Sequence, residues 1–239
     1  MSLPKINQPI YELTLPSSGK KISYRPYLVK EDKILLMAAE SGDPKEMGTA
    51  TRQVVNNCVV DKNFDCDDLP IFDVDFIFMN IRAKSVGEKI SQFYTCNNQV
   101  DDHICGETFT VDINIKDVKV IMPDNPKEFW LSENLGVKMK YPSYKTTMSL
   151  LETDNELEQT IKTLYGSIEY FYDKEQTFSM RDTTLDKFKI FVDDLTTDQF
   201  NKLKKFIENI PYFEIKKSVT CPKCGFVHEM TYGDPISFF

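Results

Sequence analysis

Apolar and polar residues alternate near the start of the chain with the period of two that is typical of β-strands. Leu13 and Leu15 fall on one face of the first run, and residues 16–19 have the composition of a turn. The second run, residues 21–25, stops at Pro26, which has no backbone N–H to donate to a sheet. The pattern predicts an N-terminal β-hairpin.

From about residue 30 the apolar residues recur at helical spacing instead. Ile34 and Ala38 share one face of a first helix, which Gly42 ends. Asp43 and Pro44 open the next helix, because Pro fits the first helical turn. The three helices expected in this part of the chain occupy about residues 30–41, 43–58 and 74–89.

The rest of the chain contains segments with the strand period of two and segments with helical spacing. Apolar stripes such as Leu157, Ile161 and Leu164 predict further helices. Strands are expected at residues 90–95, 107–115, 213–220 and 227–232, and residues 118–122 and 137–141 are expected to form two more short strands or loop. Helices are expected at residues 155–173, from 185 onward, and from 197 to 210, and residues 123–134 are expected to form a turn-rich, ordered loop.

This order of elements predicts an α+β fold in three parts. An N-terminal domain at residues 1–90 holds the hairpin and the first helices. A zinc-ribbon-like β region combines residues 91–122 with residues 211–239. A helical insertion, residues 123–210, separates its two halves.

Composition narrows the classes of function. The 239 residues carry a net charge of -8, which argues against a general duplex-binding surface, because such a surface needs clustered Lys and Arg. No apolar run approaches the length of a membrane-spanning helix, and the N-terminus lacks the apolar core of an export signal. We therefore expect a cytoplasmic protein that contacts other proteins and neither nucleic acid nor membrane.

The strongest chemical signal is the run Cys221-Pro222-Lys223-Cys224-Gly225. Two thiolates separated by two residues form a knuckle that presents both sulfurs to one metal ion, and the following glycine can adopt the left-handed backbone of the turn. A structural zinc site requires four ligands, so a second pair of ligands is needed.

Cys96 and Cys105 are the best candidates for the second pair. They flank a polar loop between two expected strands, and Cys105-Gly106 repeats the Cys-Gly step of the first knuckle. Two hairpins that meet over one ion form a zinc ribbon. We therefore predict a structural Zn2+ held by Cys96, Cys105, Cys221 and Cys224.

Other interpretations of the cysteines stay open. The four thiols could be ordinary reduced cysteines, or Cys221 and Cys224 could form a redox pair. His103 or His228 could replace one cysteine ligand, although a surface or supporting role is favoured for His228. Cys58 and Cys66 are expected to be structural or incidental.

Two further features are the acidic runs, which are expected to be solvated loops, and the terminal pair Phe238-Phe239, which is expected to dock into the protein's own core or a partner's groove.

Three segments together resemble a known family. They are residues 13–20 (LTLPSSGK), residues 24–40 (YRPYLVKEDKILLMAAE), and the ending with the knuckle CPKCGFVHE and the terminal Phe-Phe. These segments resemble the T-even-type contractile-tail phage baseplate hub assembly proteins, whose first part is similar to tail assembly chaperones.

The resemblance implies a non-enzymatic hub subunit or assembly factor with other baseplate hub proteins as partners and no catalytic residues. Such a protein would act in the host cytoplasm during tail assembly and could remain in the virion baseplate. The alternative is a zinc-ribbon protein that binds nucleic acid or regulates transcription, which the charge of -8 disfavours. Salt-dependent DNA binding would favour that alternative.

Overall fold

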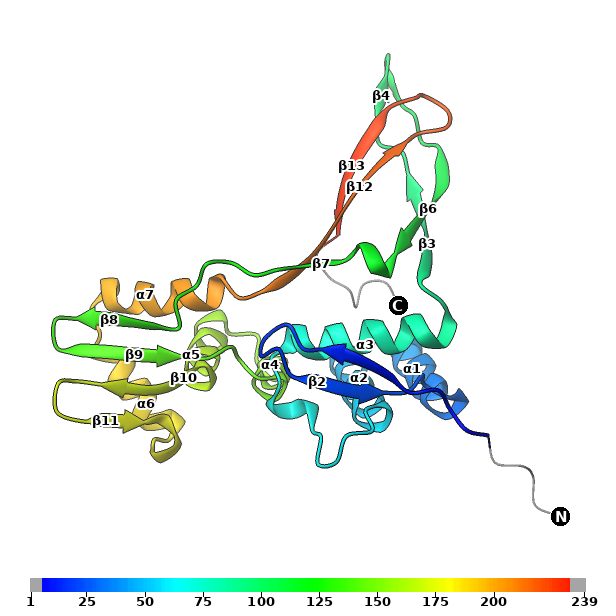
Figure 1. Ribbon diagram of the computed structural model, residues 1–239. Helices are drawn as coiled ribbons and strands as arrows, with labels where there is room; N and C mark the ends of the chain where they lie inside the picture. The colour runs from blue at the N-terminus through cyan, green and yellow to red at the C-terminus, as the bar shows by residue number, and fades with distance from the viewer. Residues whose placement is uncertain (1–5, 233–239) are drawn as a thin grey trace.

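The computed structural model describes residues 6–232 and has three parts (Figure 1). Two lobes that contain helices and strands lie next to each other, and an arm of β-strands rises from the N-terminal lobe. Within the described residues the fold is mixed α+β, with seven α-helices and several small antiparallel sheets. The predicted fold class is confirmed, whereas the predicted domain boundaries stay a prediction.

The N-terminal hairpin forms as the alternation predicts. Strands β1 (Tyr11–Thr14) and β2 (Lys21–Tyr24) are antiparallel, with Leu13 opposite Ile22. Gly19 in the turn adopts a φ of 70°, in the left-handed region that suits glycine. The inward-facing side chains of both strands are buried in the core of the lobe.

Three helices pack behind this hairpin: α1 (Val29–Ser41), α2 (Pro44–Cys58) and α3 (Ile71–Val86). Gly42 ends α1 with a φ of 66°, and the Asp43 carboxylate caps α2 by accepting the Lys45 N–H at 2.9 Å. Helix α3 begins at Ile71, directly after Pro70, and therefore earlier than the predicted residue 74. The capping signals in the sequence therefore predicted the boundaries of α1 and α2 closely.

A short fourth helix, α4 (Tyr144–Leu150), completes the N-terminal lobe from much later in the chain. The fully buried Tyr144 donates its hydroxyl proton to the Gly48 carbonyl at 2.7 Å. A Cβ at position 48 would occupy the space that the end of the Met148 side chain fills, so a larger residue there would require Met148 to move. The sequence pattern did not predict this helix.

A buried ion pair fixes the hairpin to α1. Glu31 has no exposed surface, and its carboxylate accepts from the Arg25 guanidinium at 3.0 Å and from the Leu28 N–H at 2.9 Å. Arg25 also donates to the Asn57 carbonyl at the end of α2, at 3.0 Å. One arginine therefore joins β2, α1 and α2.

The second lobe contains a four-stranded antiparallel sheet in the order β11-β10-β9-β8. Its strands are β8 (Glu128–Ser132), β9 (Leu135–Met139), β10 (Ile168–Tyr172) and β11 (Thr177–Ser179). Its helices are α5 (Glu156–Ser167), α6 (Leu185–Asp193) and α7 (Thr197–Glu208). Buried side chains from the sheet and all three helices form one core, which includes Val137, Leu164, Phe188 and Phe206.

Two predicted elements of this lobe are wrong. Residues 123–134, predicted as a loop, contain β8. The predicted helix at 155–173 ends at Ser167, and the chain continues as β10. The segment 123–210, predicted as helical, therefore contains a sheet as well as its helices.

The error at β10 has a physical cause. Ile168 and Phe171 are three residues apart and both buried, as on a helix. In the structure the pairing of β10 with β9 shifts register between Ile168 and Tyr170, so a β-bulge turns both side chains to the same face. A helical spacing of apolar residues thus arises from an interrupted strand.

The arm consists of two antiparallel hairpins that rise side by side (Figure 1). One hairpin pairs β3 (Lys89–Thr95) with β6 (Thr108–Asn114), and the other pairs β12 (Tyr212–Thr220) with β13 (Val227–Tyr232). The short strand β7 (Lys119–Ile121) pairs with β12 near the body. These strands confirm the predicted pairs at 90–95 with 107–115 and at 213–220 with 227–232.

Apolar side chains join the two hairpins where the arm leaves the body. Val111 and Ile113 from one hairpin lie in the same core as Ile215 and Met230 from the other, and Met79 of α3 closes that core below. The two hairpins belong to separate sheets. They are therefore held together by side chains and not by a backbone ladder.

The Glu31 carboxylate should stabilise the fold in a pH-dependent way. Burial raises the pKa of Glu31, but the hydrogen bonds from Arg25 and from the Leu28 N–H outweigh it, so the pKa lies below its usual 4.5. The stabilisation is full above the pKa of the unfolded chain and is lost as pH falls through the lower pKa of the folded chain. We expect Glu31→Gln to lower the free energy of unfolding by roughly 2 kcal/mol near neutral pH, the usual contribution of hydrogen bonds to a charged group.

Urea titrations near neutral pH and in mild acid measure this effect. The difference between wild type and Glu31→Gln should shrink in acid, because wild-type Glu31 then becomes protonated. Glu12 is the matched control, since it is exposed on the same hairpin, and Glu12→Gln should change stability by less than about 0.5 kcal/mol. Equal effects of the two substitutions would refute the role of the buried carboxylate.

Candidate metal centre

The turn between β12 and β13 is a cysteine knuckle. The Cys221 N–H donates to the Phe226 carbonyl at 2.8 Å, and the Gly225 N–H donates back to the Cys221 carbonyl at 3.0 Å. Gly225 has a φ of 73°, the left-handed conformation that the sequence predicted for this position. The turn therefore fixes the backbone on both sides of Cys221 and Cys224.

The connection between β3 and β6 repeats the same hydrogen bonds. The Cys96 N–H donates to the Glu107 carbonyl at 2.7 Å, and the Gly106 N–H donates to the Cys96 carbonyl at 3.1 Å. Gly106 has a φ of 66°. In both turns the glycine after the second cysteine bonds back to the first cysteine, so the two knuckles are equivalent in their backbone.

The long spacer of this knuckle does not disturb it. Residues 97–104 project as a small hairpin of their own, in which β4 (Gln99–Val100) pairs with β5 (His103–Ile104). Asp101 makes the tight turn with a φ of 51°. The Cys105 N–H donates to the Asn98 carbonyl at 2.9 Å, which closes the base of the insertion. The insertion therefore leaves both cysteines in knuckle positions.

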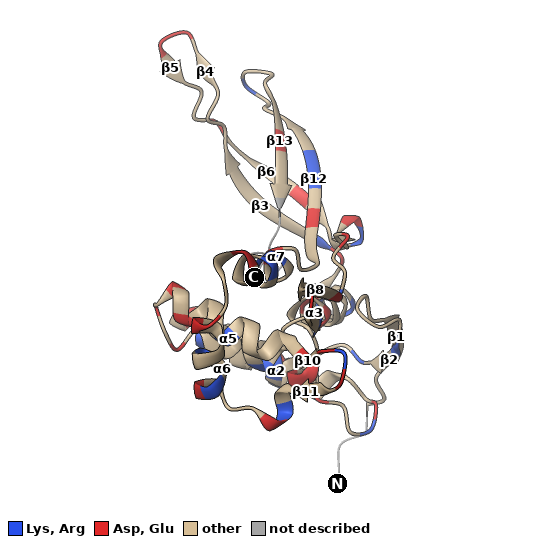
Figure 2. Ribbon diagram, turned by 90° about the vertical axis from the view of Figure 1, so that its left-hand side faces the viewer, with Lys and Arg blue, Asp and Glu red and all other residues tan. Residues whose placement is uncertain are grey.

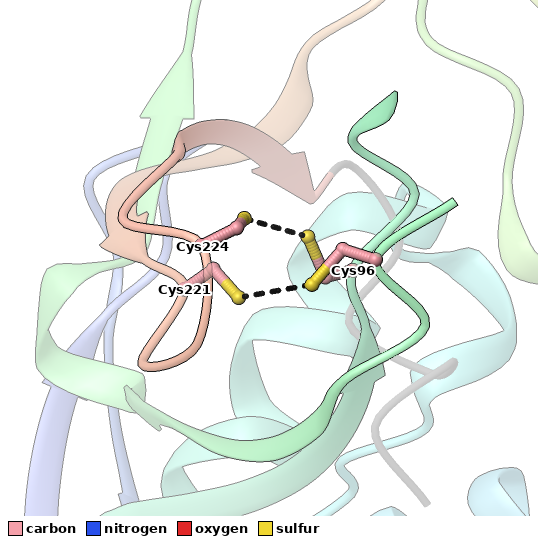
Figure 3. Close-up of side chains that lie close together, drawn as sticks. Cys96, Cys221 and Cys224 are labelled. Atoms are coloured by element: carbon pink, nitrogen blue, oxygen red, sulfur yellow. Dashed lines mark hydrogen bonds between the residues drawn. The ribbon is translucent and has the colours of Figure 1, made fainter. Parts of the chain in front are cut away.

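The four cysteines meet at the far end of the arm, and we call Cys96, Cys105, Cys221 and Cys224 the cysteine cluster. Their four sulfur atoms all lie within 4.8 Å of one another. The Sγ–Sγ distance is 3.7 Å from Cys96 to Cys224 and 3.9 Å from Cys105 to Cys221. Figure 3 shows the sulfur of Cys224 facing that of Cys96.

These distances fit a tetrahedral zinc ion. With a Zn–S bond of about 2.3 Å, the edge of a regular tetrahedron of sulfurs is about 3.8 Å. The Cys96–Cys224 and Cys105–Cys221 separations of 3.7 and 3.9 Å bracket that value. Cys96, Cys105 and Cys221 are buried, and Cys224 is partly exposed. The donor set is thus four soft ligands in a space that excludes most water.

The thiols differ in how readily they lose a proton. Burial raises the pKa of Cys96 to about 12. A hydrogen bond from the Phe226 N–H lowers the pKa of Cys224 to about 6. Four thiolates so close together repel one another, so all four ionise together only around a cation.

A histidine and a tyrosine support the cluster from the side. His228 is buried, with Nε2 at 3.2 Å from the Cys96 Sγ and Nδ1 at 3.3 Å from the Tyr94 hydroxyl. If Nδ1 accepts the tyrosine proton, Nε2 carries a hydrogen and donates it to the sulfur. Asn98 approaches the Cys224 Sγ at 3.7 Å in the same way. Nothing in the sequence pattern pointed to Tyr94 or Asn98.

The other candidate residues lie elsewhere. His103 is exposed on β5, outside the cysteine cluster. Burial raises the pKa of Cys58 to about 11 and that of Cys66 to about 12, so both thiols stay protonated. Cys66 lies between Asp65 and Asp67, but Asp67 already forms an ion pair with Arg52.

The cysteine cluster joins parts of the chain that are remote in sequence. Cys105 and Cys221 are separated by 116 residues, and the whole second lobe lies between them. Four thiolates would occupy every position of a tetrahedral zinc ion, which leaves none open for a substrate. Such a site is suited to holding structure and not to catalysis.

Comparison with known proteins identifies the family. The family model described as T4 bacteriophage base plate protein matches residues 8–239, nearly the whole chain. Searches of curated proteins and of solved structures found no significant match. None of the described helices is both long and apolar enough to cross a membrane. The chain therefore belongs to the T4 bacteriophage base plate protein family.

Proposed function

We propose that this protein is a non-enzymatic subunit or assembly factor of the baseplate hub in a contractile phage tail. The observation that carries the proposal is the match to the base plate family over residues 8–239. The protein acts in the host cytoplasm while the tail assembles, through contacts with other hub proteins. Its resemblance to hub assembly proteins at both ends of the chain supports the hub as its place in the baseplate.

The chemistry of the buried polar groups supports a structural role. The Glu31 carboxylate holds Arg25, and the Asp73 carboxylate accepts the backbone N–H and the hydroxyl proton of Ser17 in the hairpin turn. Both acids therefore join elements of the N-terminal lobe. Neither is free to exchange protons with a substrate.

The charge on the arm favours protein partners over nucleic acid. Acidic and basic residues, among them Glu214 and Lys216, are interspersed along β12, and β13 carries the acidic Glu229 (Figure 2). A surface that binds a phosphate backbone needs clustered positive charge. Mixed charge of this kind suits the rim of a protein interface instead.

We further propose that the cysteine cluster binds one structural Zn2+ with four thiolate ligands. The tetrahedral sulfur spacing supports zinc, and so does the equivalence of the two knuckles. The lowered pKa of Cys224 would also suit a redox thiol. The presence of four sulfurs, and not two, favours the metal. Bound zinc holds the two hairpins of the arm together at their far end.

Tail assembly in infected cells tests the proposed role. A phage with this gene disrupted should make no complete baseplates, and supplying the wild-type protein from a plasmid should restore them. Electron microscopy of lysates and plaque counts measure both results. Antibody detection in purified virions shows whether the protein remains in the baseplate. Normal baseplates without the protein would refute the proposal.

Metal analysis tests the zinc site. The purified protein should contain one zinc ion per chain, and Cys105→Ser or Cys221→Ser should lose most of it. A chelator should lower the melting temperature of wild type, because metal binding contributes to folding. Cys58→Ala and Cys66→Ala are matched controls, since they remove buried thiols outside the cluster and should keep the zinc. Wild-type protein free of metal would exclude the site.

His228 should retain the metal through its hydrogen bond to Cys96. We expect His228→Leu to release zinc faster and to bind it roughly tenfold more weakly, as is usual when a group that supports a ligand is removed. His228→Gln keeps an N–H donor and should be closer to wild type, and Tyr94→Phe should have a smaller effect. Zinc transfer to a coloured chelator gives the rates. Equal rates for all variants would show that His228 only fills space.

A further inference from the structure

Helix α1 has an apolar face that no other part of residues 6–232 covers. Only Glu31 and Ala38 of this helix are buried. Val29, Leu36 and Met37 are exposed at 70%, 57% and 71%. Because these three residues are spaced by seven and eight positions, they lie on one side of the helix. Figure 1 shows α1 at the end of the N-terminal lobe that is remote from the second lobe.

A groove lies beside this face. It occupies about 530 Å³ between α1 and α2. Its α1 side is apolar, with Ile34, Met37 and Ala38, whereas the α2 side adds Ala50 but is otherwise lined by polar and charged residues: Asp43, Lys45, Glu46, Thr49 and Gln53. Flexible side chains such as methionine adapt well to a groove of this kind. The apolar face and the groove together form a surface on which a second helix can pack.

Two charged side chains flank the apolar centre of the face. Lys33 lies one turn before Leu36 and Met37, and Glu40 lies one turn after them. Both are exposed, and none of the ion pairs found within residues 6–232 involves either of them. The face is therefore positive at one end, negative at the other and apolar between.

We propose that α1 of a second copy of this chain covers the face, with the two helices antiparallel about a two-fold axis. An axis that passes between Leu36 and Met37 puts Leu36 of each copy next to Met37 of the other. The same axis puts Lys33 of each copy opposite Glu40 of the other. A parallel pair would instead bring like charges together, so the charges select the antiparallel pair.

The self-complementary order of the charges identifies the partner. A two-fold interface uses the same patch on both copies, so each group needs its counterpart on that same patch. Lys33 and Glu40 meet this condition, at equal distances in sequence from the centre of the face. The inference does not depend on the hub role or on the zinc site. One helix pair is a small interface, so we expect a weak dimer in equilibrium with the monomer.

Sedimentation velocity of the full-length, zinc-loaded protein over a range of concentrations tests the proposal. Wild type should shift from monomer to dimer as concentration rises. Lys33→Glu alone and Glu40→Lys alone should each weaken the dimer roughly tenfold, because each places like charges opposite one another. The double variant Lys33→Glu with Glu40→Lys should restore wild-type association, since the pairs are only exchanged.

Two further variants separate association from folding. Leu36→Glu with Met37→Glu should be monomeric at every concentration and melt at the wild-type temperature, because both side chains are exposed. Ile190→Glu is the matched control, since Ile190 is 66% exposed on α6 in the other lobe and its replacement should leave the dimer intact. A wild-type protein that stays monomeric overturns the proposal, even if the same face binds another protein. A double charge exchange that fails to restore the dimer also overturns it.

Discussion

The arm depends on a contact between two hairpins that belong to separate sheets and share no backbone-to-backbone ladder. A two-stranded ribbon such as β3–β6 is marginally stable in water, because it has little apolar area to bury, and the other hairpin gains only the short strand β7 at one edge. Here side chains such as Val111 and Ile215 join the ribbons near the body, and four sulfurs join them at the far end. Both contacts join a segment from the middle of the chain to one near its C-terminus. The arm is therefore a product of tertiary structure and not of either hairpin alone.

The sequence predicted those features that short-range chemistry determines. Gly42 and Asp43 marked the boundary between α1 and α2, and alternation located all four long strands of the arm. The four cysteines could be grouped because the Cys-Gly step occurs twice. Each of these signals lies within a few residues of the feature that it predicts. Such signals do not depend on how distant parts of the chain pack.

The features that were missed depend on distant contacts. The β-bulge near Tyr170 exists only because β9 lies beside β10, and the same apolar residues alone fit a helix equally well. Helix α4 is short and gains its place by packing against Gly48 of α2. The contact of His228 with Cys96 requires both hairpins to be in place. No window of neighbouring residues contains that information.

The tip of the small hairpin, residues 101–104, stands outside the hydrogen bonds of the knuckle that carries it, whereas Asn98 at its base bonds to Cys105 and approaches Cys224. The hydrogen bonds of that knuckle close between Cys96 and the pair Gly106 and Glu107, whatever the chain does in between. The length and sequence of the tip can therefore diverge among relatives without altering the sulfur positions, so evolution can change the end of the arm independently of its framework. For the same reason the turn at Asp101 is a natural place to introduce an epitope or a fluorophore that reports where the arm lies in an assembling tail.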